Sequence, residues 1–126
     1  MDKNTVPDFP LPKAKERNIA VCVHLLPFLG FVMPGINVAI PLAVWYWQKN
    51  ESSYIAYHAQ ESLNFQITVM IVYAVWAVSI MILVGLVLLP LVPLAYLLLI
   101  LFMVRAAIMA SKGSYYRYPL ILRLIR

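Results

Sequence analysis

Polar side chains gather on one predicted helical face between residues 57 and 68 of an otherwise apolar stretch. Four of them follow one another at intervals of 4, 3 and 4 residues, namely Tyr57, Glu61, Asn64 and Thr68. These intervals match one face of an α-helix, and His58, Ser62 and Gln66 widen the polar sector. Carboxylate, amide and hydroxyl groups in this arrangement can line a crevice that binds an ion, a substrate or a polypeptide segment.

The composition is that of a membrane protein rather than of a soluble domain. Of the 126 residues, 63% are hydrophobic and 12% are charged, whereas soluble domains are nearer half apolar and a quarter charged. The mean hydropathy is +0.84, and the surplus of apolar surface must face lipid. The ten basic residues lie at the ends of the apolar runs, which argues against a nucleic-acid partner. The sequence therefore predicts an all-α integral membrane protein.

Two further ionisable residues lie within apolar segments. His24 follows Arg17 by 7 residues, which is about 10 Å along a helix, and Arg105 lies near the inner end of the last apolar run. Such groups usually face the interior of a bundle or a wet cavity. One interpretation is a polar crevice open to the cytoplasm, lined by Glu61, Asn64, Thr68 and His24. The other is hydrogen bonding between helices, with Glu61 paired to Arg105 or His24.

The spacings that commonly mark a catalytic or metal centre do not occur in the sequence. There is no His-x₃-His or Cys-x₂-Cys pair, and none of the four glycines belongs to a phosphate-binding loop. Cys22 is the only cysteine, which excludes a disulfide or a thiolate metal site within one chain. We therefore expect a protein that is not an enzyme and that holds no cofactor or metal.

The apolar runs predict four helices within residues 14–112, at about 14–33, 37–49, 53–85 and 89–111, after a flexible polar tail over residues 1–13. Pro34 and Gly35 form a turn signal between the first two helices, and Pro27 should kink the first. The second helix is short, since a full crossing requires about 20 residues. Two alternatives stay open for this pair, namely two spanning helices or a shallow or re-entrant hairpin.

The distribution of basic residues predicts the orientation. Four precede the first helix, Lys49 lies in the middle connection and five follow from Arg105 onward, whereas the turns around Pro34 and Pro90 carry none. By the positive-inside rule, all of these charges share one side if four membrane-embedded helices have both termini in the cytoplasm. The expected location is the plasma (inner) membrane of a prokaryote.

Aromatic and basic residues predict the contacts with the membrane surface. The second helix ends in Trp45, Trp47 and Lys49, a combination typical of the interface. The tail over residues 113–126 alternates aromatic, basic and aliphatic residues and is expected to lie among anionic lipid headgroups. Its predicted anchors are Tyr116, Arg117, Tyr118 and Arg123.

A family resemblance rests on three segments. The stretch His58-Ala59-Gln60-Glu61-Ser62-Leu63-Asn64-Phe65-Gln66-Ile67-Thr68 resembles a signature of small four-helix prokaryotic membrane proteins of unknown function. Pro41-Leu42-x-x-Trp45 and Gly113-x-x-Tyr116-Arg117-Tyr118-Pro119 also fit. This family is similar to the small channel-type subunit of the chloroplast inner-envelope import (Tic) translocon, and the magnetosome proteins MamF and MmsF are more distant members. The resemblance implies four membrane helices with both termini in the cytoplasm and, from the plastid relative, a link to preprotein passage.

Two functions from different classes follow from these observations. The first is a non-enzymatic plasma-membrane protein that acts through helix–helix association, as a scaffold, an accessory subunit of a membrane-protein partner or a homo-oligomer. The alternative is a small channel or translocation element of the Tic-like import type, in which Glu61, Asn64 and Thr68 line a path open to the cytoplasm. Apolar substitution of Glu61 and Asn64 would alter assembly in the first case, and Glu61→Gln would reduce cation conductance in the second.

Overall fold

Every regular element in the described part of the chain is helical. The computed structural model describes residues 11–126, in which five α-helices and two short 3₁₀-helices follow one another without a strand. This result confirms the all-α class predicted from the sequence. The predicted polar tail over residues 1–13 falls mostly on residues 1–10, which lie outside the described residues.

The first predicted helix divides near its proline. α1 (Ala14–Leu25) begins after Lys13, whose backbone N–H donates to the Glu16 carboxylate at 2.7 Å, as in many helix N-termini. The 3₁₀-helix η1 (Leu26–Phe31) follows, because Pro27 lacks the N–H that a continuing α-helix would use. The kink predicted at Pro27 is therefore a change of helix type.

A glycine turn joins η1 to α2 (Ile36–Gln48). Gly35 adopts a left-handed φ of +98°, which glycine takes up without the strain of a Cβ atom. Its N–H donates to Asn37 Oδ1 at 3.2 Å. We call residues 14–48 the hairpin, because α1 and η1 run to this turn and α2 returns from it.

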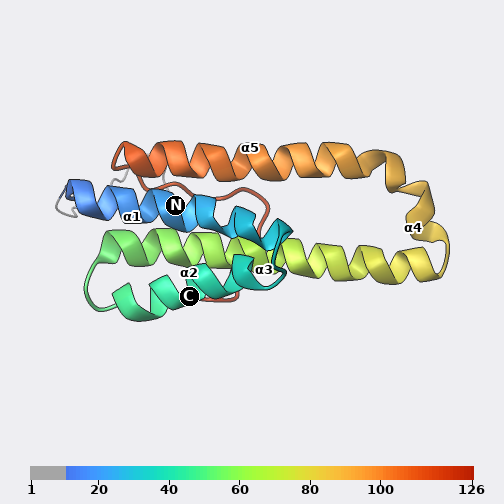
Figure 1. The fold of residues 1–126 in the computed structure, drawn as a ribbon, viewed down its shortest axis with the longest axis horizontal. Coiled ribbons are helices and arrows are strands. Elements are labelled where there is room, and N and C mark those ends of the chain that lie inside the picture. The colour runs from blue at the N-terminus through green and yellow to red at the C-terminus, as the bar shows by residue number, and fades with distance from the viewer. Residues whose placement is uncertain (1–10) are drawn as a thin grey trace.

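The two longest helices run antiparallel. α3 (Ser53–Met81) begins at Ser52, whose Oγ accepts the N–H of Ile55 at 3.3 Å. It ends at Met81 instead of the predicted residue 85, and Leu83 reverses the chain with a left-handed φ of 66°. α4 (Val84–Val87) and the 3₁₀-helix η2 (Leu89–Leu91) form the connection to α5 (Val92–Ser111), which runs back antiparallel to α3, with α1 between the two at the end opposite α4 (Figure 1).

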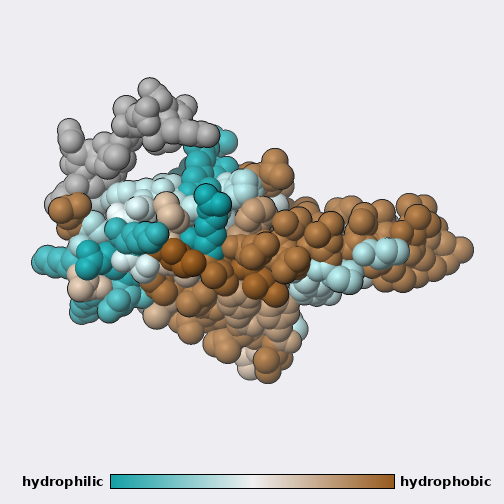
Figure 2. Space-filling model, turned by 90° about the horizontal axis from the view of Figure 1, so that it is seen from above, coloured by the Kyte–Doolittle hydropathy of each residue, from teal (hydrophilic) through white to brown (hydrophobic). Residues whose placement is uncertain are grey.

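The hairpin covers only half of this long pair. In Figure 1, α1 and α2 lie beside the halves of α3 and α5 that are nearest Ser53 and Ser111, and the chain turns back well before α4. We call the remaining two-helix part, residues 70–98, the arm. Its surface is mostly apolar, whereas polar groups gather at the opposite end (Figure 2). The covered half contains a core of Phe65, Met103, Ala106 and Tyr118.

The helix lengths distinguish the long pair from the hairpin. In the described part, two helical stretches are long and apolar enough to cross a bilayer, Ser53–Met81 and Leu89–Ser111. α1 and η1 contain 12 and 6 consecutive residues, and α2 contains 13, so α2 is well short of the roughly 20 that a full crossing requires. Of the four predicted membrane helices, two therefore have spanning length.

Candidate functional site: a C-terminal segment bound to α3

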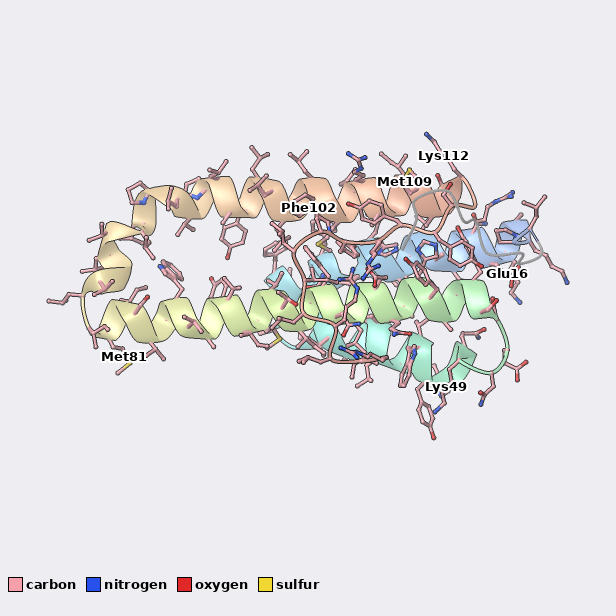
Figure 3. All side chains as sticks on the ribbon, turned by 180° about the vertical axis from the view of Figure 1, so that it is seen from behind. Glu16, Lys49, Met81, Phe102, Met109 and Lys112 are labelled. Atoms are coloured by element: carbon pink, nitrogen blue, oxygen red, sulfur yellow. The ribbon has the colours of Figure 1, made fainter. Side chains whose placement is uncertain are left out.

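The polar face predicted on α3 is occupied by the chain's own C-terminal end. After α5, Gly113 adopts a left-handed φ of +79°, and residues 114–126 turn back across the bundle without regular helix or strand. Figure 3 shows this stretch crossing in front of the helices. We call residues 114–126 the C-terminal segment. Its position means that the predicted crevice is filled.

Side chains of α3 bind the backbone of the C-terminal segment. The N–H of Tyr118 donates to Glu61 Oε2 at 2.9 Å, and the N–H of Leu122 donates to Thr68 Oγ1 at 3.0 Å. Both acceptors lie on the face that the 4, 3, 4 spacing predicted. These two contacts use backbone groups of the segment, so they do not depend on the side chains of Tyr118 and Leu122.

Near the end of the chain, two amide side chains hold Ile125. Asn64 Oδ1 accepts the Ile125 N–H at 2.9 Å, and Asn64 Nδ2 donates to the Ile125 carbonyl at 2.8 Å. Gln60 Nε2 donates to the same carbonyl at 2.8 Å. Asn64 is fully buried, and these bonds satisfy an amide whose burial would otherwise be costly.

The partner of Glu61 is Arg123, so the predicted pairing with Arg105 or His24 was wrong. Arg123 Nε and Nη2 donate to the two carboxylate oxygens at 3.1 and 3.2 Å, which is a bidentate ion pair. The C-terminal segment folds back onto α3 and brings this guanidinium to Glu61. Arg105 is exposed on α5, and His24 has other partners.

Two buried histidines connect α1 and α3 to the C-terminal segment. His58 Nε2 lies 3.0 Å from the Ser114 carbonyl, and since a carbonyl only accepts, we assign the proton to Nε2. His58 Nδ1 then accepts from His24 Nε2–H at 2.9 Å. His24 Nδ1 in turn accepts from the Tyr118 hydroxyl at 2.9 Å.

These bonds form one directed chain from Tyr118 through both imidazoles to Ser114. Burial raises the pKa of Tyr118 well above its ordinary value, so its hydroxyl keeps the proton that it donates. Both ends of the chain belong to the C-terminal segment, while its middle belongs to α1 and α3. The arrangement therefore fastens that segment to two helices at once.

Gln66 connects α3 to the hairpin instead. Its Oε1 accepts from Asn37 Nδ2 at 3.2 Å, next to the glycine turn, and its Nε2 lies 3.6 Å from Met103 Sδ. The predicted polar face thus divides into two parts. Glu61, Asn64 and Thr68 hold the C-terminal segment, and Gln66 holds the tip of the hairpin.

The aromatic cluster at the end of α2 lies at the surface. Trp47 is exposed, and Lys49 Nζ lies 5.3 Å from the Trp45 ring centroid and 4.7 Å from that of Tyr46. An ammonium over two rings suits a membrane interface, where the aromatic rings can lie in the apolar layer while the charged group stays in water.

The predicted anchors in the C-terminal segment differ from one another. Arg117 is exposed and Tyr116 is half-buried. Tyr118 is only 1% exposed, and Arg123 is bonded to Glu61. Tyr118 and Arg123 therefore bind protein groups, where the sequence predicted contact with lipid headgroups.

Two residues of the site were not predicted. Gln60 lies one helical turn before Asn64, and this i, i+4 relationship was a signal that it shares the polar face. Ser114 takes part through its backbone carbonyl alone, and no side-chain pattern could have marked it.

Comparison with known families identifies the kinship of the chain. Residues 15–125 match the model of the MamF/MmsF family, described as the magnetosome magnetite crystal formation protein family. The chain belongs to this family. The match confirms kinship with MamF and MmsF, and it does not extend to the Tic import subunit. Comparisons of this MamF/MmsF-family chain with curated proteins and with solved structures gave no match. The family and the two apolar helices together indicate a membrane-associated magnetosome protein.

Proposed function

We propose that this MamF/MmsF-family protein is a non-enzymatic integral membrane protein that acts through helix–helix association and forms homo-oligomers through the arm. One observation carries the proposal. The hydroxyl groups of Tyr73 on α3 and Tyr96 on α5 lie 3.0 Å apart on an exposed part of the arm. They are a polar pair in an otherwise apolar surface.

The length of α3 gives the depth of this pair in a bilayer. The hydrocarbon core is about 30 Å thick, or about 20 helical residues. Counted back from Met81 at the end of α3, the core begins near Ser62. Tyr73 lies 8 residues from Met81, and its depth is then close to the middle of the bilayer.

A hydroxyl pair at this depth favours a neighbouring helix over lipid. When one hydroxyl donates to the other, the second proton still needs an acceptor, and lipid tails offer none. Hydrogen bonds between membrane helices are worth roughly 0.6 to 2 kcal/mol. Tyr73 is 52% exposed, so its hydroxyl is accessible to the arm of a second copy.

The surface around the pair also suits close packing of helices. Ala77 lies one turn beyond Tyr73 on the same face of α3 and is exposed. Small residues allow membrane helices to approach closely, and their dispersion contacts drive association where the hydrophobic effect cannot. The same arm is the part of the long pair that the hairpin leaves uncovered.

For the topology, we propose that the hairpin enters the bilayer from the cytoplasmic side without crossing it, and that both termini are cytoplasmic in a prokaryotic inner membrane. Glu16, Lys49 and Lys112 all lie at the end of the bundle opposite Met81 (Figure 3). The positive-inside rule supports a cytoplasmic position for this basic end. The short α2, with 13 residues, supports a hairpin that returns to the side from which it came.

The test is association of the labelled protein in liposomes, followed by Förster transfer as the protein-to-lipid ratio rises. The double variant Tyr73→Phe/Tyr96→Phe is expected to associate about 3- to 30-fold more weakly, since it lacks the interhelical hydroxyl bonds. Tyr46→Phe is the matched control, because Tyr46 is exposed on α2 away from the arm. If the Förster transfer of the unaltered protein is no greater than random proximity in the liposome produces, the proposal is refuted. If the double variant associates as strongly as the unaltered protein, the two tyrosines do not contribute to the association.

A channel along the polar face has less support, because the C-terminal segment fills that face. The family description concerns magnetite crystal formation in magnetosomes. We extend the proposal to an assembly in the membrane where such a crystal forms, and this extension rests on the family alone.

A further inference from the structure

An arginine and an apolar groove lie together on the outer face of α5. The groove has a volume of about 400 Å³ and is lined by Arg105 with apolar side chains that include Leu98, Leu101 and Ile108. Arg105 is exposed. Among residues 11–126, the ion pair is between Glu61 and Arg123, and Arg105 forms neither an ion pair nor a hydrogen bond. Its guanidinium is available to a ligand.

The groove follows a single helical face. Leu98, Leu101, Arg105 and Ile108 recur at intervals of 3, 4 and 3 residues, and Lys112 follows 4 residues later, so all five lie on one side of α5. From Leu98 to Ile108 the helix rises about 15 Å. This length is about half of the hydrocarbon core, which is the depth of one lipid leaflet.

A ring contact between α3 and α5 indicates the depth of Arg105 in the bilayer. The rings of Phe65 and Phe102 have centroids 6.5 Å apart, so these residues lie at the same depth. Arg105 lies 3 residues beyond Phe102 toward the basic end, as Ser62 lies 3 residues before Phe65. Arg105 is therefore level with Ser62, where the length of α3 puts the boundary between hydrocarbon and headgroups.

We propose that this groove binds one anionic phospholipid. One acyl chain lies along Leu98 and Leu101, and the phosphate accepts hydrogen bonds from the guanidinium of Arg105. A guanidinium donates to two phosphate oxygens at once, and Lys112 adds positive charge at the same face. Basic sites beside membrane helices on the cytoplasmic side commonly bind anionic headgroups.

Tyr116 follows α5 in the C-terminal segment, 11 residues after Arg105. Tyr116 is half-buried and packs against the core of Phe65, Met103, Ala106 and Tyr118; burial raises its pKa, and the positive charge of Arg105 opposes that rise. A tyrosine and an arginine at this level suit the layer between hydrocarbon and water.

Charge favours a lipid over a second copy of the chain as the occupant. Of the three glutamates in residues 11–126, Glu61 is bonded to Arg123 and Glu16 to the Ser52 hydroxyl at 2.6 Å. Within residues 11–126, the exposed Glu51 is then the one glutamate of a second copy without such a bond, and it lies in the connection between α2 and α3. Covering an unpaired guanidinium with an apolar helix is costly.

The experiment is native mass spectrometry of the full-length protein released from nanodiscs that contain equal amounts of phosphatidylglycerol and phosphatidylcholine. We expect one phosphatidylglycerol retained per copy. Arg105→Gln should lower the retained fraction about fivefold, as loss of one cation near the membrane surface does. Arg105→Lys should keep most of it, and Arg126→Gln, an equal loss of charge at an exposed position, should keep all of it.

Three results would overturn the proposal. They are equal retention of the two lipids, unchanged retention by Arg105→Gln, and an equal loss in Arg126→Gln. Leu98→Trp fills the groove while leaving the guanidinium in place. This variant provides a second test if Arg105→Gln does not fold. It should also lower retention, and full retention by this variant would refute a bound acyl chain.

Discussion

The side chain of Asn64 bonds to both backbone groups of Ile125, which lies 61 residues later in the chain. It donates to the carbonyl at 2.8 Å and accepts the N–H at 2.9 Å. One amide side chain thus replaces the partner that a neighbouring strand would supply. The end of the chain is held on α3 by this reciprocal pair together with Gln60.

Asn64→Leu should release the end of the C-terminal segment while leaving the helices folded. The substitution keeps the branching of the side chain but removes both bonds, each worth about 1 kcal/mol or somewhat more. Backbone amides near Leu122 and Ile125 should then exchange about 10- to 100-fold faster, as measured by hydrogen–deuterium exchange. Asn18→Leu, at an exposed position in α1, is the control. Unchanged exchange in Asn64→Leu would contradict the reciprocal pair.

Glu61 and Arg123 should be energetically coupled. Glu61→Gln leaves the partly buried guanidinium of Arg123 without its carboxylate. Arg123→Gln leaves the buried carboxylate of Glu61 without its guanidinium, so each variant should destabilise the protein. We expect the double variant to lose about 1 kcal/mol less than the sum of the single variants. Thermal unfolding in one detergent measures this cycle. A coupling of the same size between Glu61 and Arg105 would restore the pairing that the sequence suggested.

The start of α1 should loosen in acid. The Ser52 hydroxyl and the Lys13 N–H both donate to Glu16, and these bonds, the former first, lower its pKa from the ordinary value of 4.5. A lowered pKa stabilises the folded protein at pH values above the ordinary pKa. That stability is lost as the pH falls through the lowered pKa of the folded protein. Amide exchange near Arg17 should therefore rise below a pH of about 4.5. In Ser52→Ala the rise should begin at higher pH, and identical profiles would contradict the role of this hydroxyl.

Two glycines in the connections between helices, Gly85 within α4 and Gly35 before α2, should respond differently to alanine. At Gly85 an added Cβ would lie 2.6 Å from the Ile80 nitrogen and 2.7 Å from Ser79 Oγ, so Gly85→Ala should cost about 2 kcal/mol or more through overpacking. At Gly35 no atom beyond the glycine and its two chain neighbours lies within 4 Å of the added Cβ. Gly35→Ala should cost about 1 kcal/mol, from the left-handed φ alone. Thermal unfolding separates the two, and equal losses would show that backbone conformation dominates at both turns.

The sequence predicted the local elements well, because their signals are local. Helical periodicity grouped Glu61, Asn64 and Thr68 on one face, and those residues act together in the structure. Pro34 and Gly35 marked a turn that a positive φ at Gly35 provides. The end of α3 was missed, because the reversal uses Leu83 in a left-handed conformation that its residue type disfavours.

The partner of the polar face could not be predicted, because it depends on how distant segments meet. The sequence suggested Arg105 or His24 as the partner of Glu61 and predicted Arg123 as an anchor among lipid headgroups. Only the return of the chain at Gly113 brings Arg123 to Glu61 and leaves Arg105 on the outside of α5. The pattern of Tyr118 and its neighbours suggested contact with lipid headgroups, since alternating aromatic and basic residues suit a protein groove and a headgroup layer alike.

Recognition of the C-terminal segment through its backbone has a consequence for what this part of the chain tolerates. The Leu124 side chain is exposed and can be exchanged freely, since α3 bonds to the amides and carbonyls beside it. Leu120 is exposed as well, but its left-handed φ of 56° disfavours β-branched residues at that position. The spacing between Tyr118 and Ile125 cannot change in the same way. Inserting or deleting a single residue there would shift every later amide out of reach of Thr68 and Asn64, so this stretch should accept many substitutions but no change of length.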